Sequence, residues 1–541
     1  METLYYNGTI LTMNETCDFS SPISALLTKD GKIVGLGTLK VLKAKAPKAH
    51  LVDLEGHTML PGFIDAHSHI TNQLNTYPSV APETGVLDVP TLINRLKEHF
   101  KTLGQNAGDY FIAIGYDEAY YPDKTPPTRH DLNQVSKTIP IIVYHKSLHL
   151  AVANDEAMRR QAITKNTPNP HSGIIQREVD GHPNGIFEEK ALDLLGDFLF
   201  GLVGEIKDLL PAFYKTQQYY ASFGITTAQD GASSKAYLKL LEAAQKADKL
   251  ILDVYAYPLL DGEAECLPKT ASQAQVYHKH LKILGGKIVA DGSPQAKTAW
   301  LSQPYFIPPR GESKDYRGYP LYSDEEMVNF MVPLIQREQQ ILCHCNGDAM
   351  ADQFIRTYKL ALEKTACQKN LRPVMIHAQT VREDQLDEIA NLGMIVSFFH
   401  DHVYYWGEHH RHSSLGEARA QRISPLKSAL NRGILLTLHQ DTPIIAPDMI
   451  RTLHTAVNRH THLGHPLGEA FSIPIYEALK AITINASYQA FDETIKGSLA
   501  VGKLADFVIL SDNPLTIPKT AIKTLKVLKT IKEDKVIYEA P

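Results

Sequence analysis

The chain has 541 residues, of which 43% are hydrophobic and 21% charged, and 55 basic against 60 acidic side chains give a net charge of −5. This balance excludes the concentrated positive charge of a nucleic-acid-binding protein. The 33 glycines and 31 prolines are ordinary for this length and exclude fibrous or long disordered regions.

We expect a soluble cytoplasmic protein. The chain starts with neither the basic nor the apolar segment of a secretory signal. Its apolar runs are far shorter than the about 20 residues that a bilayer requires, so no membrane partner is expected. Five cysteines cannot form a disulfide framework, which is typical of a reducing compartment. A homo-oligomer is left open.

Short β-strands are predicted near both ends of the chain. The first sixty residues give Thr3–Leu11, Ile23–Thr28 and Lys32–Gly35, with a hairpin turn at Asp30-Gly31. The same pattern returns at Asp506–Leu510, Val527–Ile531 and Lys535–Tyr538. Residues 1–60 and 496–541 are therefore predicted to form one small β-domain.

The middle of the chain, residues 61–495, alternates apolar strands with amphipathic helices, which predicts an α/β fold with a parallel sheet. The predicted strands are Gly62–Ala66, Ile225–Gln229, Leu252–Tyr257, Lys287–Ala290, Gln340–His344, Pro373–His377, Met394–Phe399 and Ile434–His439. The predicted helices are Ser234–Lys246, Asp324–Arg337, Ala349–Lys364, Arg382–Asn391 and Leu415–Arg432. Eight such units indicate a (β/α)8 barrel of the TIM type. The first two strands are about 160 residues apart, too far for one crossover, so an inserted subdomain is expected near residues 80–215.

The strongest local signal is a His-x-His pair after the first barrel strand. Side chains alternate along a strand, so His67 and His69 project to the same side, where two imidazoles make ready metal ligands. Other strands end in His344, His377 and Asp441. Because barrel active sites lie at the carboxyl ends of the strands, we expect these five side chains to converge.

The order of motifs in this chain resembles the amidohydrolase superfamily, within it the amidohydrolase 3 branch that includes N-substituted formamide deformylases. The matching segments are residues 60–69, 224–230, 287–293, 344–349, 376–379 and 497–510. The resemblance covers nearly the whole chain. It implies a metal-dependent barrel and a β-sandwich built from both ends of the chain.

The resemblance also implies a ligand set. It assigns His67, His69 and Asp441 to one divalent metal, and His344 and His377 to a second. Lys287 would bridge the two as a carbamate formed with carbon dioxide. In the alternative with a single metal, His377 contacts substrate or water instead. Zinc is the expected ion, although iron, manganese and nickel accept the same ligands.

Asp441 is the predicted catalytic residue. A carboxylate beside a metal-activated water can take its proton and later pass it to the leaving amine. His149 matches a segment that the branch places at the mouth of the site, and His400 ends the seventh strand, so both are predicted to contact substrate. His439, two residues before Asp441, is interpreted as a structural residue.

The leading hypothesis is a hydrolase that cleaves an amide or N-substituted formamide bond of a small molecule. A ring deaminase of the same superfamily is the first alternative. The segment His344–Asp348 lacks the glutamate that such deaminases carry after strand five, which disfavours it. A non-catalytic barrel homologue is the second alternative, and the retained ligands disfavour it.

Overall fold

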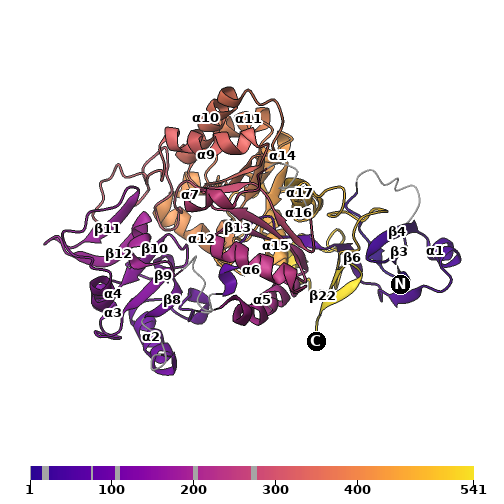
Figure 1. Cartoon of the computed structure of the whole chain (residues 1–541), viewed down its shortest axis with the longest axis horizontal. Helices are drawn as coiled ribbons and strands as arrows, with labels where there is room; N and C mark the ends of the chain where they lie inside the picture. Colours follow the sequence, from indigo (N-terminus) through magenta and orange to yellow (C-terminus); the bar gives the residue numbers. More distant parts are fainter. Residues whose placement is uncertain (1, 15–22, 75–76, 104–109, 199–204, 270–276) are drawn as a thin grey trace.

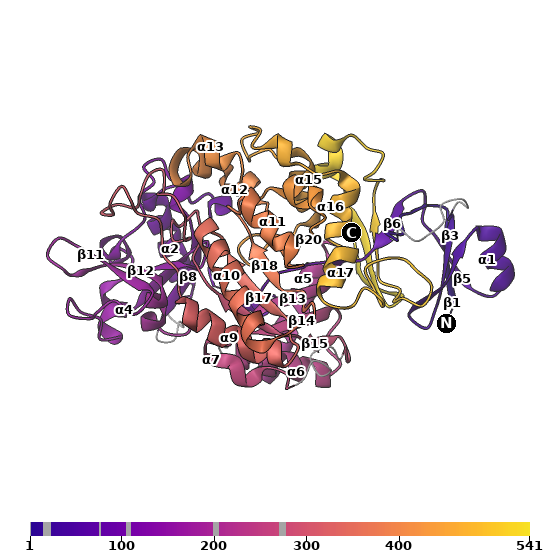
Figure 2. The same cartoon turned by 90° about the horizontal axis from the view of Figure 1, so that it is seen from above.

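The computed structural model describes residues 2–14, 23–74, 77–103, 110–198, 205–269 and 277–541. Three parts follow one another along the longest axis of the molecule (Figure 1). A β-rich part holds both termini, a barrel occupies the centre, and an inserted subdomain lies at the opposite end, an order that is also visible from above (Figure 2). Within the described ranges, no helix combines the length and apolar composition needed to cross a bilayer.

The barrel is built from two parallel sheets. The first has the order β15 (Leu281–Ile283), β14 (Asp253–Pro258), β13 (Ile225–Ser233), β7 (Phe63–Ile64). The second has the order β16 (Gly286–Val289), β17 (Ile341–Cys345), β18 (Val374–His377), β19 (Ile395–Phe398), β20 (Leu436–Leu438).

Backbone contacts join the two sheets on both sides. A parallel bridge between Leu259 and Lys287 closes one side. On the other side the amide N of Asp441 lies 3.3 Å from the carbonyl O of His67, and the amide N of His69 lies 2.8 Å from the carbonyl O of Thr442. The predicted barrel fold is confirmed. The backbone contacts of His67 and His69 also fix the end of the first strand against the loop that carries Asp441.

The fourth barrel strand is split, which the sequence analysis did not predict. Its first half, β15, pairs with β14, and its second half, β16, pairs with β17. Between them a Cβ on Gly285 would lie 1.7 Å from the carbonyl O of Gln340, so only glycine fits this approach. The split places Lys287 on the half that faces β17.

Helices cover the outside of the barrel (Figures 1 and 2). α6 begins after Ser234, whose side chain accepts from the amide of Tyr237, and α9 begins with a capping box between Ser323 and Glu326. The covering helices are α5 (Ile206–Ala221), α6 (Lys235–Lys246), α9 (Asp324–Gln336), α10 (Asp348–Thr365), α11 (Glu383–Asn391), α12 (His402–His409), α14 (Leu426–Asn431), α15 (Met449–Asn458), α16 (Ile475–Ala481) and α17 (Ile484–Gln489).

The single helix predicted over residues 415–432 is wrong. The segment forms α13 (Glu417–Ala420) and then α14. Ser424 has a φ of +46°, and Pro425 stands at the start of α14, where it has no N–H to continue a helix. Both features break the helix between the two parts.

The β-rich part consists of two sheets with a common core. One has the order β4 (Lys32–Gly37), β3 (Ala25–Lys29), β1 (Glu2–Tyr6), β5 (His50–Asp53). The other has the order β2 (Thr9–Ile10), β6 (Thr58–Pro61), β21 (Phe507–Leu510), β22 (Val527–Lys532), β23 (Lys535–Glu539). Tyr5 and Leu26 of the first sheet pack with Met59 and Phe507 of the second. These sheets agree with the expected β-sandwich.

The strand predicted over Thr3–Leu11 is two strands. Asn7 has a φ of +58°, and the backbone turns there from β1 into β2, which belongs to the other sheet. A Cβ on the following Gly8 would lie 2.5 Å from the carbonyl O of His57, so glycine is required at this crossing.

The inserted subdomain has a sheet with apolar residues on both faces. Its order is β11 (Gly173–Arg177), β12 (Pro183–Glu189), β10 (Leu150–Ala153), β9 (Ile141–His145), β8 (Phe111–Tyr116), and its helices are α2 (Val89–Leu103), α3 (Arg129–Leu132) and α4 (Asp155–Arg160). After β12 the 3-10 segment η4 (Lys190–Leu195) runs over the barrel mouth. The helix α5 that follows packs against α6 and β13 of the barrel.

Candidate metal centre

Three side chains meet where the first and last barrel strands end. His67 and His69 follow β7, and Asp441 lies in the loop after β20. Oδ1 of Asp441 lies 3.2 Å from Nε2 of His69 and 3.7 Å from Nε2 of His67. One ligand atom from each of the three residues falls within 4.8 Å of the other two. The structure therefore brings these predicted site residues together.

The imidazole of His67 is fixed by a residue of the second strand. Its Nδ1 lies 2.5 Å from Oε1 of Gln229. An amide oxygen only accepts, so Nδ1 carries the hydrogen and the lone pair of Nε2 faces Asp441. A Cβ on Gly231 would lie 2.2 Å from Cε1 of the ring, so the strand needs glycine to make room for it. His67 is thus held in the tautomer of a metal ligand.

Lys287 points into the same cluster. Its Nζ lies 2.9 Å from Nε2 of His67, and its side chain is buried. Burial lowers the pKa of Lys287 to about 8, against the opposing effect of Asp441. A lysine with a lowered pKa is more often a neutral amine, the form that reacts with carbon dioxide.

His344 enters the site from β17 beside His377 from β18. The two ring centroids are 4.4 Å apart. Nδ1 of His344 lies 2.9 Å from Oδ1 of Asp291, a buried carboxylate that also accepts from the amides of Asn346 and Gly347 at 3.0 and 2.8 Å. These bonds hold Asp291 rigidly behind the ring of His344.

His377 is supported by two further side chains. Its Nδ1 lies 3.1 Å from Nε2 of His439, whose Nδ1 lies 2.8 Å from Oγ of Ser397. Burial lowers the pKa of His439 to about 3, so this ring is neutral. When Nδ1 of His439 donates to Ser397, its Nε2 accepts from His377, and the lone pair of His377 Nε2 is left for the site.

The charge at Asp441 is set by opposing effects. Burial alone would raise its pKa, but the adjacent imidazoles of His69 and His67 hold that pKa well below its usual range. Its Oδ1 is buried and makes no hydrogen bond. An ionised carboxylate oxygen in this position, facing two imidazole nitrogens, suits a divalent cation.

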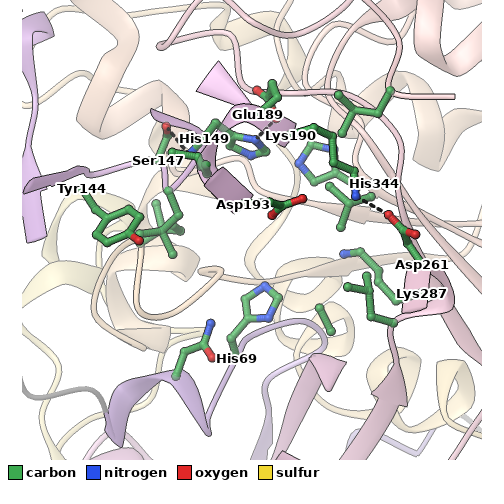
Figure 3. Close-up of a pocket in the computed structure, with 18 of the residues that line it drawn as sticks. His69, Tyr144, Ser147, His149, Glu189, Lys190, Asp193, Asp261, Lys287 and His344 are labelled. Carbon is green, nitrogen blue, oxygen red and sulfur yellow. Dashed lines mark hydrogen bonds and ion pairs between the residues drawn. The ribbon is translucent and has the colours of Figure 1, made fainter. Parts of the chain in front are cut away.

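A cavity of about 500 Å³ lies above these residues. His69, Lys287, His344, His377 and Asp441 line its floor. Its walls include the apolar side chains of Leu148, Leu192, Ala232, Leu259, Val289, Leu321 and Ile444. In Figure 3 the residues of the inserted subdomain stand opposite those of the barrel, so the cavity lies between the two parts.

The two predicted substrate contacts are placed differently. His149 lines the cavity, with its ring centroid 5.3 Å from that of His344 and its Nδ1 2.9 Å from Oε2 of Glu189. His400 is buried elsewhere and its Nε2 lies 2.8 Å from the carbonyl O of Thr452. The structure thus brings His149 to the cavity and does not bring His400 there.

Several supporting residues were missed by the sequence analysis. Gln229 lies within β13 and Asp291 follows β16, and both stand inside quoted motifs, which could have marked them. Ser397 is a single polar residue within the apolar strand β19, which is a weaker signal. Glu189 lies in the inserted subdomain and had no sequence signal at all.

The described residues contain a second group with metal-ligand chemistry, formed by Asp117, Glu118 and His145. Nε2 of His145 lies 3.3 Å from Oε2 of Glu118 and 3.6 Å from Oδ1 of Asp117. Against the effect of burial, these two carboxylates raise the pKa of His145 to about 10. The protonated ring fits an ion pair with them and offers no lone pair to a metal.

Comparisons with known proteins agree with this geometry. A model of the amidohydrolase family matches residues 50–538. A putative amidohydrolase, YtcJ, of Bacillus subtilis is 24% identical and covers 100% of both chains. An N-substituted formamide deformylase of Arthrobacter pascens is 24% identical over 96% of both chains.

Solved structures show the same fold. An uncharacterized metal-dependent hydrolase from Pyrococcus horikoshii superposes with a TM-score of 0.73 at 24% identity, over 96% of this chain and 99% of that one.

Proposed function

We propose that this chain, which belongs to the amidohydrolase family and is a hydrolase of its metal-dependent kind, cleaves a carbon–nitrogen bond of amide or N-substituted formamide type. The observation that carries this proposal is the meeting of His67, His69 and Asp441, because His69 and Asp441 of this group line the floor of a cavity. The 24% identity to a formamide deformylase supports the choice of bond.

The donor set fits a divalent ion. His67, His69 and Asp441 would hold one ion, and His344 and His377 a second, with Lys287 between them as a carbamate. Two nitrogens and one oxygen within 4.8 Å suit zinc. An ion bound there polarises a carbonyl and lowers the pKa of water toward neutrality.

The chain's own residues account for the other steps. The ionised Oδ atoms of Asp441 accept the proton of the attacking water and return it to the nitrogen of the leaving amine. Gln229 and Asp291 keep the imidazoles of His67 and His344 oriented. The apolar walls receive the body of a small substrate and exclude bulk water.

The test is metal analysis of the purified protein, followed by a panel of amides, N-substituted formamides and lactams. We expect one or two metal equivalents and turnover that is lost with a chelator. His67→Ala should lose metal and activity while circular dichroism stays unchanged. His50→Ala, at an exposed position in β5, is the matched control and should keep both. Full metal occupancy in His67→Ala, or an inactive metal-loaded enzyme across the panel, would contradict the proposal.

A further inference from the structure

We propose that the substrate of this site carries a cationic group, an ammonium or guanidinium, which pairs with Asp193 at the roof of the cavity. This inference rests on the proposed function and adds the charge of the substrate to it. It follows from which charged groups around the cavity already have partners and which do not.

The two lysines that line the cavity are engaged. Nζ of Lys190 pairs with the carboxylate of Asp261, which also accepts from the hydroxyl of Tyr322 at 2.8 Å. The same ammonium lies 5.8 Å from the centre of the Tyr322 ring. Nζ of Lys287 faces His67 in the metal cluster. Neither lysine is therefore available to bind an anionic substrate group.

Among the residues that the structure describes, the carboxylate of Asp193 has no such bonded partner, although the ammonium of Lys190 is close enough to act on its charge. It belongs to η4, and Figure 3 shows its carboxylate reaching into the space between His149 and Lys287. Within the described part of the chain, the carboxylate of Asp193 has no hydrogen bond and no ion pair, although it lines the cavity. Its partner is thus expected to come from the bound molecule.

Glu189 supplies a second, buried carboxylate next to this position. Its side chain is only 3% exposed, and while Oε2 contacts His149, Oε1 is buried without a hydrogen-bond partner. A Cβ on Gly292 would lie 2.2 Å from Oε1, so the barrel loop needs glycine there to admit the carboxylate. The carboxylate of Glu189 in the inserted subdomain therefore packs against the backbone of a barrel loop at Gly292.

Glu189 also has a strained backbone, with φ +49° and ψ −122°. Non-glycine residues rarely adopt such a conformation, and it persists where surrounding contacts enforce it, often at functional sites. Together, Asp193 and Oε1 of Glu189 place carboxylate oxygens with no hydrogen-bond partner among the described residues at the roof, above apolar walls. A substrate with an apolar stem and a cationic end fits both features, and a substrate with an anionic end is repelled.

The experiment compares two formamides of equal shape. N-(5-aminopentyl)formamide ends in an ammonium where N-hexylformamide ends in a methyl group. We expect the metal-loaded enzyme to prefer the ammonium compound by about tenfold or more in kcat/KM. Asp193→Asn should remove that preference, so that the ratio of the two kcat/KM values falls toward one. Asp512→Asn, an exposed carboxylate in the β-rich part, is the control and should keep the preference.

A binding measurement separates this inference from the proposed bond specificity. Calorimetry with 5-aminopentan-1-ol and hexan-1-ol needs no turnover. Tighter binding of the amino alcohol that is lost in Asp193→Asn supports the inference even when neither formamide is cleaved, an outcome that would fail the proposed function alone. Equal binding of both alcohols, or a preference that survives in Asp193→Asn, would overturn the inference.

Discussion

Oε1 of Gln229 lies 2.5 Å from Nδ1 of His67, so Nδ1 carries the hydrogen and the lone pair of Nε2 is left facing Asp441. Gln229 thus sets the tautomer of the first histidine of the His-x-His pair, and Gly231, two residues further along the same strand, leaves room for the ring.

Gln229→Leu removes the acceptor at Nδ1 of His67. We expect metal affinity to fall about 10- to 100-fold, because the ring then loses the partner that fixes its tautomer and orientation. Competition with a chelator of known affinity measures the change. Gln229→Glu keeps an acceptor and should remain near the parent affinity. Unchanged affinity in the leucine variant would show that other contacts orient the ring.

Asp441→Asn should bind metal and lose turnover by at least about 100-fold, since an amide of the same shape cannot accept the proton of water. Elemental analysis and steady-state rates on the best substrate of the panel measure the two effects separately. Activity near the parent level would exclude Asp441 as the base and leave it as a ligand only.

Lys287→Ala tests the bridging carbamate. The variant should lose at least one metal equivalent and most activity, and short carboxylic acids should partly restore both by filling the vacated space. An unmodified ammonium beside two divalent ions would be repelled by them. A crystal structure with two metals and an unmodified lysine would refute the bridge.

Asp253 links the barrel to the β-rich part, and its removal should lower the free energy of unfolding. Its carboxylate, 0% exposed, pairs with Lys496, lies 3.2 Å from Nζ of Lys532 and accepts from Tyr277. Asp253→Ala leaves the buried ammonium of Lys496 without its carboxylate partner, while Lys532 keeps Asp506, and we expect it to destabilise the fold by about 3–5 kcal/mol. Denaturant unfolding measures this. Asp248→Ala, which breaks the exposed pair with Lys279, should cost at most about 1 kcal/mol.

Glu188 predicts a pH-dependent stability. Burial raises its pKa to about 7, helped by Glu189 and Glu312 and opposed by the bond from Gln176 and by Tyr319. The folded state therefore holds the proton more tightly than the unfolded one. The resulting stability is fully present below about pH 4.5 and is lost as the pH rises through 7.

Glu188→Gln should remove this dependence, because the glutamine stays neutral at every pH. Thermal unfolding between pH 5.5 and 8.5 is the measurement, and the parent should lose more stability across this range than the variant. Parallel pH profiles for the two proteins would show that the carboxyl does not contribute.

The barrel could be predicted from the sequence because its strands are apolar runs that end in polar residues. His67, His69, His344, His377 and Asp441 could be proposed as site residues because each lies at or shortly after the end of such a run. The split of the fourth strand at Gly285 and the break at Ser424 were missed, because both depend on a close approach or a dihedral angle and not on periodicity.

Contacts between segments that are distant in the sequence could not be predicted either. Glu189 reaches His149 only because β12 and β10 are neighbours in the inserted sheet. Asp193 reaches the cavity only because η4 crosses the barrel mouth. Neither residue stands in a recognisable motif, so their roles follow from tertiary structure alone.

The pairing of β6 with β21 has a consequence for how this protein is made. β6 lies just before the first barrel strand, but its neighbour β21 is synthesised only after the whole barrel. Most of the chain therefore emerges from the ribosome while the edge of β6 still lacks its partner strand. Contacts between segments so distant in sequence also form slowly. Truncation before Phe507 should leave that edge open to pairing with other chains.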